Sequence, residues 1–262
     1  MKITVDAQPV YIATGHKEFD PELPSVVFIH GTGQDHTIWV LPTRYFARHN
    51  RNVLAIDLPG HGQSGGKPLT SIEAMADWII KVMDTAGIDA AAMVGHSMGS
   101  LVAIALAAKY ADRARVIGLI GTAVPMPVSE PLLNSAKENS PDAIEMLTLW
   151  GHGSSAHLGG SATPGMWMLG GGKRLMERAA PGVIYADLNA CNEYKQGLED
   201  AGSISCHALL ILGQSDLMTP TRATRGLTDA LSDSETVVLE KSGHAMLSER
   251  PDQVLDQLIR IV

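Results

Sequence analysis

A serine placed between two glycines is the first feature of this 262-residue chain that could do chemistry. The pattern G-x-S-x-G occurs twice, as GHSMG at residues 95–99 and as GQSGG at residues 62–66. A serine is exposed for attack on a sharp turn from a strand into a helix. Only Ser97 lies between a strand-like run and a helical run, whereas Ser64 is followed by GGKP, which is typical of a loop. Ser97 is therefore the candidate nucleophile, with a buried structural serine as the alternative.

A serine hydroxyl attacks when a base takes its proton and a third group fixes the tautomer of that base. Asp216 follows the apolar run ALLILG, and His244 follows TVVLE. Both stand where expected strands end, and open α/β sheets place their sites at the carboxyl ends of strands. The sequence predicts a catalytic triad of Ser97, Asp216 and His244. The alternative for Asp216 is an Asx turn ahead of Thr219 and Pro220.

Other histidines and acids compete for these roles. The chain has ten histidines, and His61, in the loop after the run NVLAID, is the nearest rival to His244 as the base. No acid follows the run RVIGLIG, where Thr122 and Ala123 come next. The second plausible position for a triad acid is therefore empty.

Acyl transfer also needs N–H donors for the developing oxyanion. The residue after the nucleophile is Met98, and the glycines of HGTG at residues 30–33 let that loop fold against the site. The backbone amides of Thr32 and Met98 are the candidate oxyanion hole. The alternative for the HGTG segment is a plain tight turn.

The elements that must position these residues alternate along the chain, which is typical of an α/β sheet with crossover helices. A capping-box spacing from Thr70 to Glu73 predicts a helix that ends at Gly87, and further helices are expected over residues 97–110, over residues 220–231 and after Pro251. With an antiparallel edge hairpin over residues 2–6 and 9–14, the count reaches about eight strands. The other strands are expected at residues 25–30, 52–57, 91–96, 115–121, 208–213 and 236–240.

The pattern changes between Val124 and Lys195, where prolines, glycines, Met and Trp occur irregularly and no strand is indicated. We expect a core domain from residues 1–123 and 196–262, with residues 124–195 (the insertion) as a helical or irregular cap, or lid. Both ends of the insertion should emerge at the edge of the sheet that carries the triad. The predicted substrate pocket is the apolar set Met126, Met146, Leu147, Trp150, Met166, Trp167 and Met168.

Composition narrows the class of protein. The chain is 45% hydrophobic and 18% charged with a net charge of -8, which favours a folded globule and argues against a nucleic-acid partner. Its longest strictly apolar stretch, residues 101–108, is short for a membrane span, and the N-terminus is polar. A cytoplasmic protein without a membrane partner is expected. Cys191 and Cys206 lack metal or redox spacing and are expected to be reduced packing residues.

Five motifs in this order resemble those of the α/β-hydrolase superfamily, in its cap-bearing branch. They are HGTG at 30–33 with Trp39 beyond it, DLPGHGQS at 57–64, GHSMG at 95–99, GQSD at 213–216 and SGHAMLSERP at 242–251. The resemblance covers nearly everything except the insertion. It implies an α/β-hydrolase fold with a mostly parallel eight-stranded sheet flanked by helices, and the triad order matches its elbow pattern.

The motifs and the resemblance together predict a serine hydrolase, of the carboxylesterase type, that cleaves small to medium uncharged esters through an acyl-enzyme on Ser97. No metal or organic cofactor is implied, and the oligomeric state is left open. The alternatives are a lactonase or a carbon–carbon bond hydrolase of the same fold, or a ligand receptor with slow turnover. Carbon–carbon hydrolases usually take acidic substrates, and residues 124–170 contain no Arg and only one Lys, Lys137, although Lys173 and Arg174 follow closely.

Overall fold

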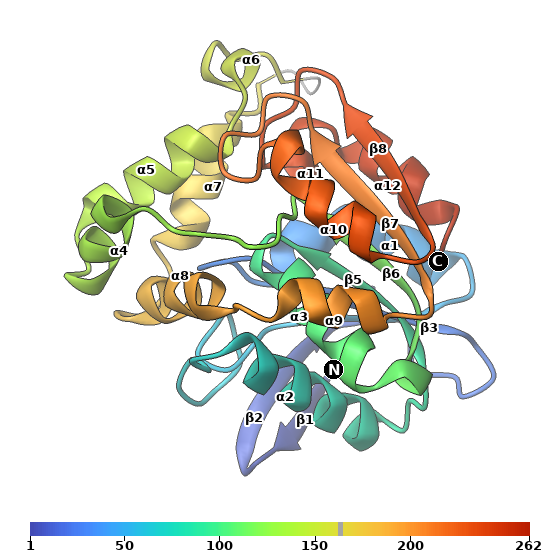
Figure 1. Ribbon diagram of the computed structural model, residues 1–262. Helices are drawn as coiled ribbons and strands as arrows, with labels where there is room; N and C mark the ends of the chain where they lie inside the picture. The colour runs from blue at the N-terminus through green and yellow to red at the C-terminus, as the bar shows by residue number, and fades with distance from the viewer. Residues whose placement is uncertain (162–164) are drawn as a thin grey trace.

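The computed structural model describes residues 1–161 and 165–262, and its centre is one eight-stranded sheet (Figure 1). The strand order is β1-β2-β4-β3-β5-β6-β7-β8, with β3 to β8 parallel and the β1–β2 hairpin antiparallel at one edge. The predicted α/β-hydrolase fold is thus confirmed. The strands are β1 (Lys2–Val5), β2 (Gln8–Ala13), β3 (Ser25–Ile29), β4 (Asn52–Ile56), β5 (Ala91–His96), β6 (Ala114–Ile120), β7 (His207–Gly213) and β8 (Ser234–Leu239).

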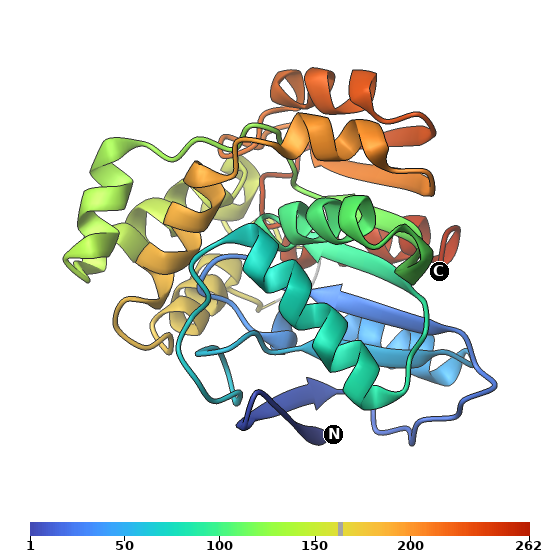
Figure 2. The ribbon, with the colours of Figure 1, turned by 60° about the horizontal axis from the view of Figure 1, so that its bottom comes forward.

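Helices cover both faces of the sheet, which explains why its central strands are apolar on both sides (Figure 2). In β3, Val27 and Ile29 pack into the core cluster that contains α2 (Ile72–Ala86) and α3 (Met98–Lys109). The alternate residues Val26 and Phe28 pack into a second cluster, together with α1 (Val40–Arg48) and α12 (Pro251–Ile259). The two cores hold the ends of the parallel strands in fixed positions.

Some helix boundaries differ from those that the sequence predicts. The N-cap of α2 is Ser71, whose hydroxyl accepts from the amide of Ala74, and not Thr70. The helix ends at Gly87, which adopts a left-handed φ of 70°. The helix expected over residues 220–231 is divided into η3 (Thr221–Thr224) and α10 (Arg225–Ala230). Short turns at η1 (His36–Trp39), η2 (Ala111–Arg113) and α11 (Met246–Glu249) complete the core.

The insertion is helical throughout most of its described part and lies beyond the end of the sheet to which the parallel strands point (Figures 1 and 2). Its helices α4, α5, α7 and α8 enclose an apolar cluster of their own, which includes Leu132, Leu147 and Leu188. The chain then returns to the sheet through α9 (Gly197–Ser203). The helices of the insertion are α4 (Glu130–Lys137), α5 (Pro141–Gly151), α6 (Ser154–His157), α7 (Met168–Met176) and α8 (Val183–Glu193).

Within residues 1–161 and 165–262, no helix is both long enough and apolar enough to cross a membrane.

Candidate active site

Ser97 occupies a strained turn between β5 and α3. Its φ is 53°, a left-handed value that is uncommon for a residue with a side chain. The turn needs glycine on both sides: a Cβ on Gly95 would lie 2.0 Å from the carbonyl oxygen of Gly99, and a Cβ on Gly99 would lie 2.2 Å from that of Ile29. The backbone therefore places Ser97 at the start of a twelve-residue helix, as the first of the two motif copies predicts.

The second motif copy has a different role. The hydroxyl of Ser64 donates to the carbonyl of Asp57 at 2.7 Å and accepts from the amide of Tyr11 at 2.9 Å. One bond connects the loop to strand β2 at Tyr11, and the other connects it to Asp57, the residue after β4. Ser64 is therefore engaged as a structural group.

Asp216 and His244 are brought together from the ends of β7 and β8. Nδ1 of His244 lies 2.8 Å from Oδ2 of Asp216, and both side chains are buried. The other oxygen, Oδ1, accepts from the amides of Met218 and Thr219, each at 2.8 Å. The Asx turn and the triad partnership, which the sequence presented as alternatives, thus use different oxygens of one carboxylate.

Thr219 is a member of this group that the sequence analysis missed. Its Oγ1 donates to Oδ2 of Asp216 at 2.7 Å and lies 3.2 Å from Nδ1 of His244. Burial by itself raises the pKa of Asp216, but the charge of His244 and the hydrogen bonds from His244 and Thr219 outweigh it, so the pKa lies well below its usual value. The carboxylate is ionised at neutral pH and can orient the imidazole.

Nε2 is the ring nitrogen of His244 that Asp216 does not hold. Nε2 is buried without a hydrogen-bond partner among the residues that the structure describes. His244 and Ser97 both line the cavity, and each is less than a tenth exposed. In the same cavity as a serine, an unpaired imidazole nitrogen is a candidate to accept the proton of the hydroxyl.

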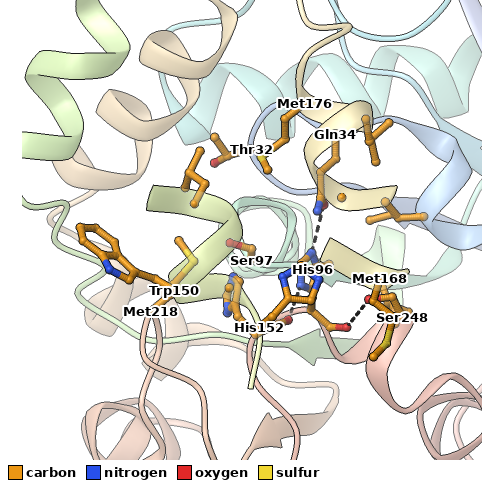
Figure 3. Close-up of a pocket in the computed structure, with 18 of the residues that line it drawn as sticks. Thr32, Gln34, His96, Ser97, Trp150, His152, Met168, Met176, Met218 and Ser248 are labelled. Carbon is orange, nitrogen blue, oxygen red and sulfur yellow. Dashed lines mark hydrogen bonds between the residues drawn. The ribbon is translucent and has the colours of Figure 1, made fainter. Parts of the chain in front are cut away.

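His96, the residue before the nucleophile, supports the base. Its Nε2 donates to the backbone carbonyl of His244 at 3.0 Å, and its Nδ1 lies 3.2 Å from Oε1 of Gln34 (Figure 3). Burial lowers the pKa of His96 to about 3, so the ring is neutral. His96 is a structural contact of the His244 loop.

The HGTG loop lies against the nucleophile. A Cβ on Gly31 would be 3.1 Å from Cβ of Ser97. The amides of Thr32 and Met98 donate to no protein acceptor within the described parts of the chain. The loop is fixed from the insertion, because Oδ2 of Asp187 in α8 accepts from the amide of Gly33 at 2.8 Å.

His61, the rival base, is occupied elsewhere. Its Nε2 lies 2.9 Å from Oδ2 of Asp187, and its ring packs on that of His30 with 4.8 Å between centroids. Burial lowers the pKa of His61, but the charge and hydrogen bond of Asp187 outweigh this and raise the pKa above its ordinary value. His61 is not among the residues that line the cavity at Ser97.

The cavity above Ser97 has a volume of about 920 Å³, and more than half of the residues that line it belong to the insertion, most of them apolar (Figure 3). Met146 was expected in this lining and is not part of it, because it packs against the insertion's own cluster. The free thiol of Cys191, from α8, also lines the cavity. The other expected pocket residues do line it: Met126, Leu147, Trp150, Met166, Trp167 and Met168.

Among the described residues, two arginine side chains reach the cavity, and both are paired. Arg174 lies 2.5 Å from a carboxylate oxygen of Glu177, and Arg178 lies 2.6 Å from Oδ2 of Asp35. Lys173 is paired with Glu145. The arginine charges that reach this space are therefore already compensated by protein carboxylates.

Asp35, His36 and Asp57 are of the types that bind metal ions, and their ligand atoms lie within 4.8 Å of one another. Oδ1 of Asp57 accepts from the amide of His36 and lies 2.8 Å from its Nδ1, while Oδ2 accepts from the amide of Gln63. Asp35 is paired with Arg178. These groups are engaged with each other and with the backbone.

Comparison with known proteins agrees with the fold. The profile of the Alpha/beta hydrolase family matches residues 26–257, so the chain belongs to this family and is a hydrolase. It is similar to (E)-2-((N-methylformamido)methylene)succinate hydrolase of Acinetobacter baylyi, with 24% identity over 252 residues, 92% of this chain and 91% of that one. A thermophilic esterase from Thermogutta terrifontis superposes with a TM-score of 0.85 at 22% identity, over 99% of this chain and 96% of the other.

A further similarity is confined to part of the chain. Identity with the dihydrolipoyllysine-residue acetyltransferase component of the acetoin cleaving system of Cupriavidus necator is 41% over 97 residues. These residues are 37% of this chain and 26% of that protein. The match thus concerns about a quarter of that longer relative.

Proposed function

We propose that this protein is a carboxylesterase in which Ser97, His244 and Asp216 form the catalytic triad. The observation that carries the proposal is the unpaired Nε2 of His244, whose Nδ1 is held by Asp216, in the same cavity as the strained Ser97. Ser97 attacks the acyl carbon while its proton passes to Nε2 of His244. The proton then moves to the alcohol oxygen as the carbon–oxygen bond breaks, which leaves an acyl-enzyme.

In the second half of the reaction, water attacks the acyl carbon and gives its proton to Nε2 of His244. The bond to Oγ of Ser97 breaks, the serine recovers the proton and the carboxylic acid leaves. In both halves the negative oxygen is stabilised by the amides of Thr32 and Met98, which have no protein acceptor among the described residues. The strained turn at Ser97 fixes one of these donors relative to the nucleophile.

The cavity favours uncharged esters of small to medium size. Its lining is mainly apolar, and the arginines that reach it are already paired with carboxylates. An acidic substrate would have to compete with these carboxylates for an arginine at the exposed side of the cavity, or enter without a counter-charge, which burial makes unfavourable. The Acinetobacter relative is named for a succinate derivative. Because the arginines are paired, we propose that this chain prefers uncharged esters to substrates of that acidic kind.

We also propose that residues 124–195 act as a cap domain on a core of residues 1–123 and 196–262. The insertion supplies much of the cavity lining, from Met126 to Cys191. The acyl group of the substrate would therefore contact the side chains of the insertion. Acyl-chain preference is then set by this segment.

A rate panel tests the proposed function. One purified sample is assayed with aryl esters, lactones and thioesters of graded acyl length, and with an aryl diacid monoester as a charged control. Multiple turnovers of uncharged esters, faster than the other classes, are expected. Preference for lactones or for the acidic substrate would replace the carboxylesterase assignment. Release of no more than one product per protein molecule would indicate a receptor.

A further inference from the structure

The insertion contacts the loop of the catalytic base at one narrow junction. A Cβ on Gly243, the residue before His244, would lie 2.3 Å from the amide nitrogen of Gly153 and 2.7 Å from the carbonyl carbon of His152. The two backbones thus pass each other closely enough that only glycine fits at Gly243. The end of α5 and the His244 loop form one packed unit.

A buried carboxylate joins the two backbones. Glu249, which is 1% exposed, accepts from the amide of Gly243 through Oε1 and from the amide of Gly153 through Oε2, each at 3.0 Å. On the other side of His244, the amide of Ala245 donates to the carbonyl of Gly151 at 2.7 Å. The residues on both sides of His244 are therefore bonded, directly or through Glu249, to residues 151–153.

We infer that Glu249 is a positioning residue, which ties the insertion to the catalytic base and thereby fixes the direction of Nε2 of His244. The inference rests on the proposed triad. Nδ1 of His244 is set by Asp216, but the ring orientation also depends on the backbone that carries it. That backbone is held by Glu249, by the carbonyl of Gly151 and by His96, whose Nε2 donates to the carbonyl of His244.

A consequence is that the insertion takes part in catalysis as well as in substrate binding. Small misplacements of a reacting group are costly, since an error of about 1 Å can reduce a rate by roughly 100-fold. An apolar lid that merely covered the site would affect substrate affinity. A segment that holds the base in place affects the chemical step.

The first test is Glu249→Gln, with the exposed Glu240→Gln as matched control. The amide keeps the size of the side chain but directs an N–H group at one of two backbone N–H donors. We expect kcat for an aryl ester to fall roughly 10- to 100-fold while KM changes by less than about threefold. Rates are taken per active site, counted by phosphonate labelling of Ser97 run to completion, at a temperature where circular dichroism shows every variant folded.

The second variant acts on the same junction without changing charge. Gly243→Ala should separate the two backbones, because its Cβ meets main-chain atoms that cannot rotate away. Gly202→Ala is the control, since a Cβ there meets nothing within 4 Å. Loss of kcat in Gly243→Ala and not in Gly202→Ala supports the inference. Wild-type kcat per active site in both Glu249→Gln and Gly243→Ala would overturn it.

A spectroscopic readout separates this inference from the proposed esterase activity. The proton on Nδ1 of His244, bonded to Asp216, is expected at low field in the ¹H NMR spectrum and is assigned by its loss in Asp216→Asn. It should move or broaden in Glu249→Gln and stay unchanged in Glu240→Gln. An unchanged resonance would contradict the positioning role. Absence of ester turnover by the wild type would instead defeat the proposed function and leave the NMR test valid.

Discussion

Ser97 and Ser64 fit the same five-residue pattern but have different surroundings. Ser97 lines the cavity, whereas the hydroxyl of Ser64 is hydrogen-bonded to two backbone groups. Ser97→Ala removes the proposed nucleophile, so we expect ester turnover to fall roughly 10³-fold or more, with the fold retained. Ser64→Ala removes hydrogen bonds to two backbone groups, and Ser64 does not line the cavity at Ser97. It should leave kcat near that of the wild type and reduce the free energy of unfolding by about 1 kcal/mol. Steady-state assays and urea unfolding of both variants check this. The opposite pattern would mean that Ser64 is the nucleophile and that Ser97 has the structural role.

A second single-residue prediction concerns the charge of Asp216. Asp216→Asn keeps the shape of the side chain but removes the charge that orients His244. Turnover is expected to fall by a factor on the order of 10² to 10⁴, as when a triad imidazole is held in the wrong tautomer. The measurement is kcat at neutral pH. A nearly unchanged rate would assign the role of the acid to another residue.

Some site residues follow from sequence and others do not. Ser97, Asp216 and His244 could be proposed because each stands just after a recognisable strand, and parallel strands bring their carboxyl ends together. Thr219 and Glu249 act through contacts that cross from one loop to another, and their immediate sequence indicates only a turn and a short helix. The position of Glu249 five residues after His244, in a motif that also resembles the family, was the one available signal.

At the scale of elements, buried strands were easier to predict than helix starts. The apolar runs of β3, β4 and β5 are bounded by polar loops, so their ends were placed within a residue. Thr70 and Ser71 are both competent caps, and only the backbone determines that Ser71 bonds to Ala74. A helical or irregular cap was expected, but its individual helices could not be placed. They pack partly on one another, as the cluster around Leu132 shows, and their sequence has no long apolar period.

A prediction about the insertion is that its side chains set the acyl-chain preference. Truncation to Ala of cavity-lining residues such as Met126, Leu147 and Trp150 should lower the ratio of rates for long against short acyl esters. Each lost methylene contact is worth roughly 1 kcal/mol. Met146→Ala is the matched control, because Met146 packs in the same segment without lining the cavity. A fixed chain-length profile, accompanied only by lower thermal stability, would show that the insertion does not set acyl preference.

At the scale of the whole molecule, buried histidines should make folding sensitive to acid. Burial lowers the pKa of His30 to about 4 and that of His96 to about 3, and it also lowers the pKa of His152. The unfolded chain takes up these protons near pH 6.5, before the folded protein does. These groups therefore favour the native state above pH 6.5, and their contribution is lost as the pH falls toward 4.

The expected slope can be measured directly. Each excluded proton lowers the free energy of unfolding by about 1.4 kcal/mol per pH unit in this window. His36 and His61 have raised pKa values, so their stabilising contribution is present below pH 6.5 and is lost only as the pH rises above it. Reversible urea unfolding at a series of pH values should show a steep decline between pH 6 and pH 4.5. Constant stability over that range would contradict the burial of these rings as neutral groups.

The acyl-enzyme is the central intermediate of this account, and trapping it is the most direct test. The protein is mixed with an excess of an uncharged aryl ester, quenched in acid during turnover and analysed by peptide mass spectrometry. An added acyl mass is expected on the peptide that contains Ser97. It should be absent in Ser97→Ala and should increase when deacylation is slowed. Turnover with no adduct on Ser97, or with the adduct on another residue, would contradict it.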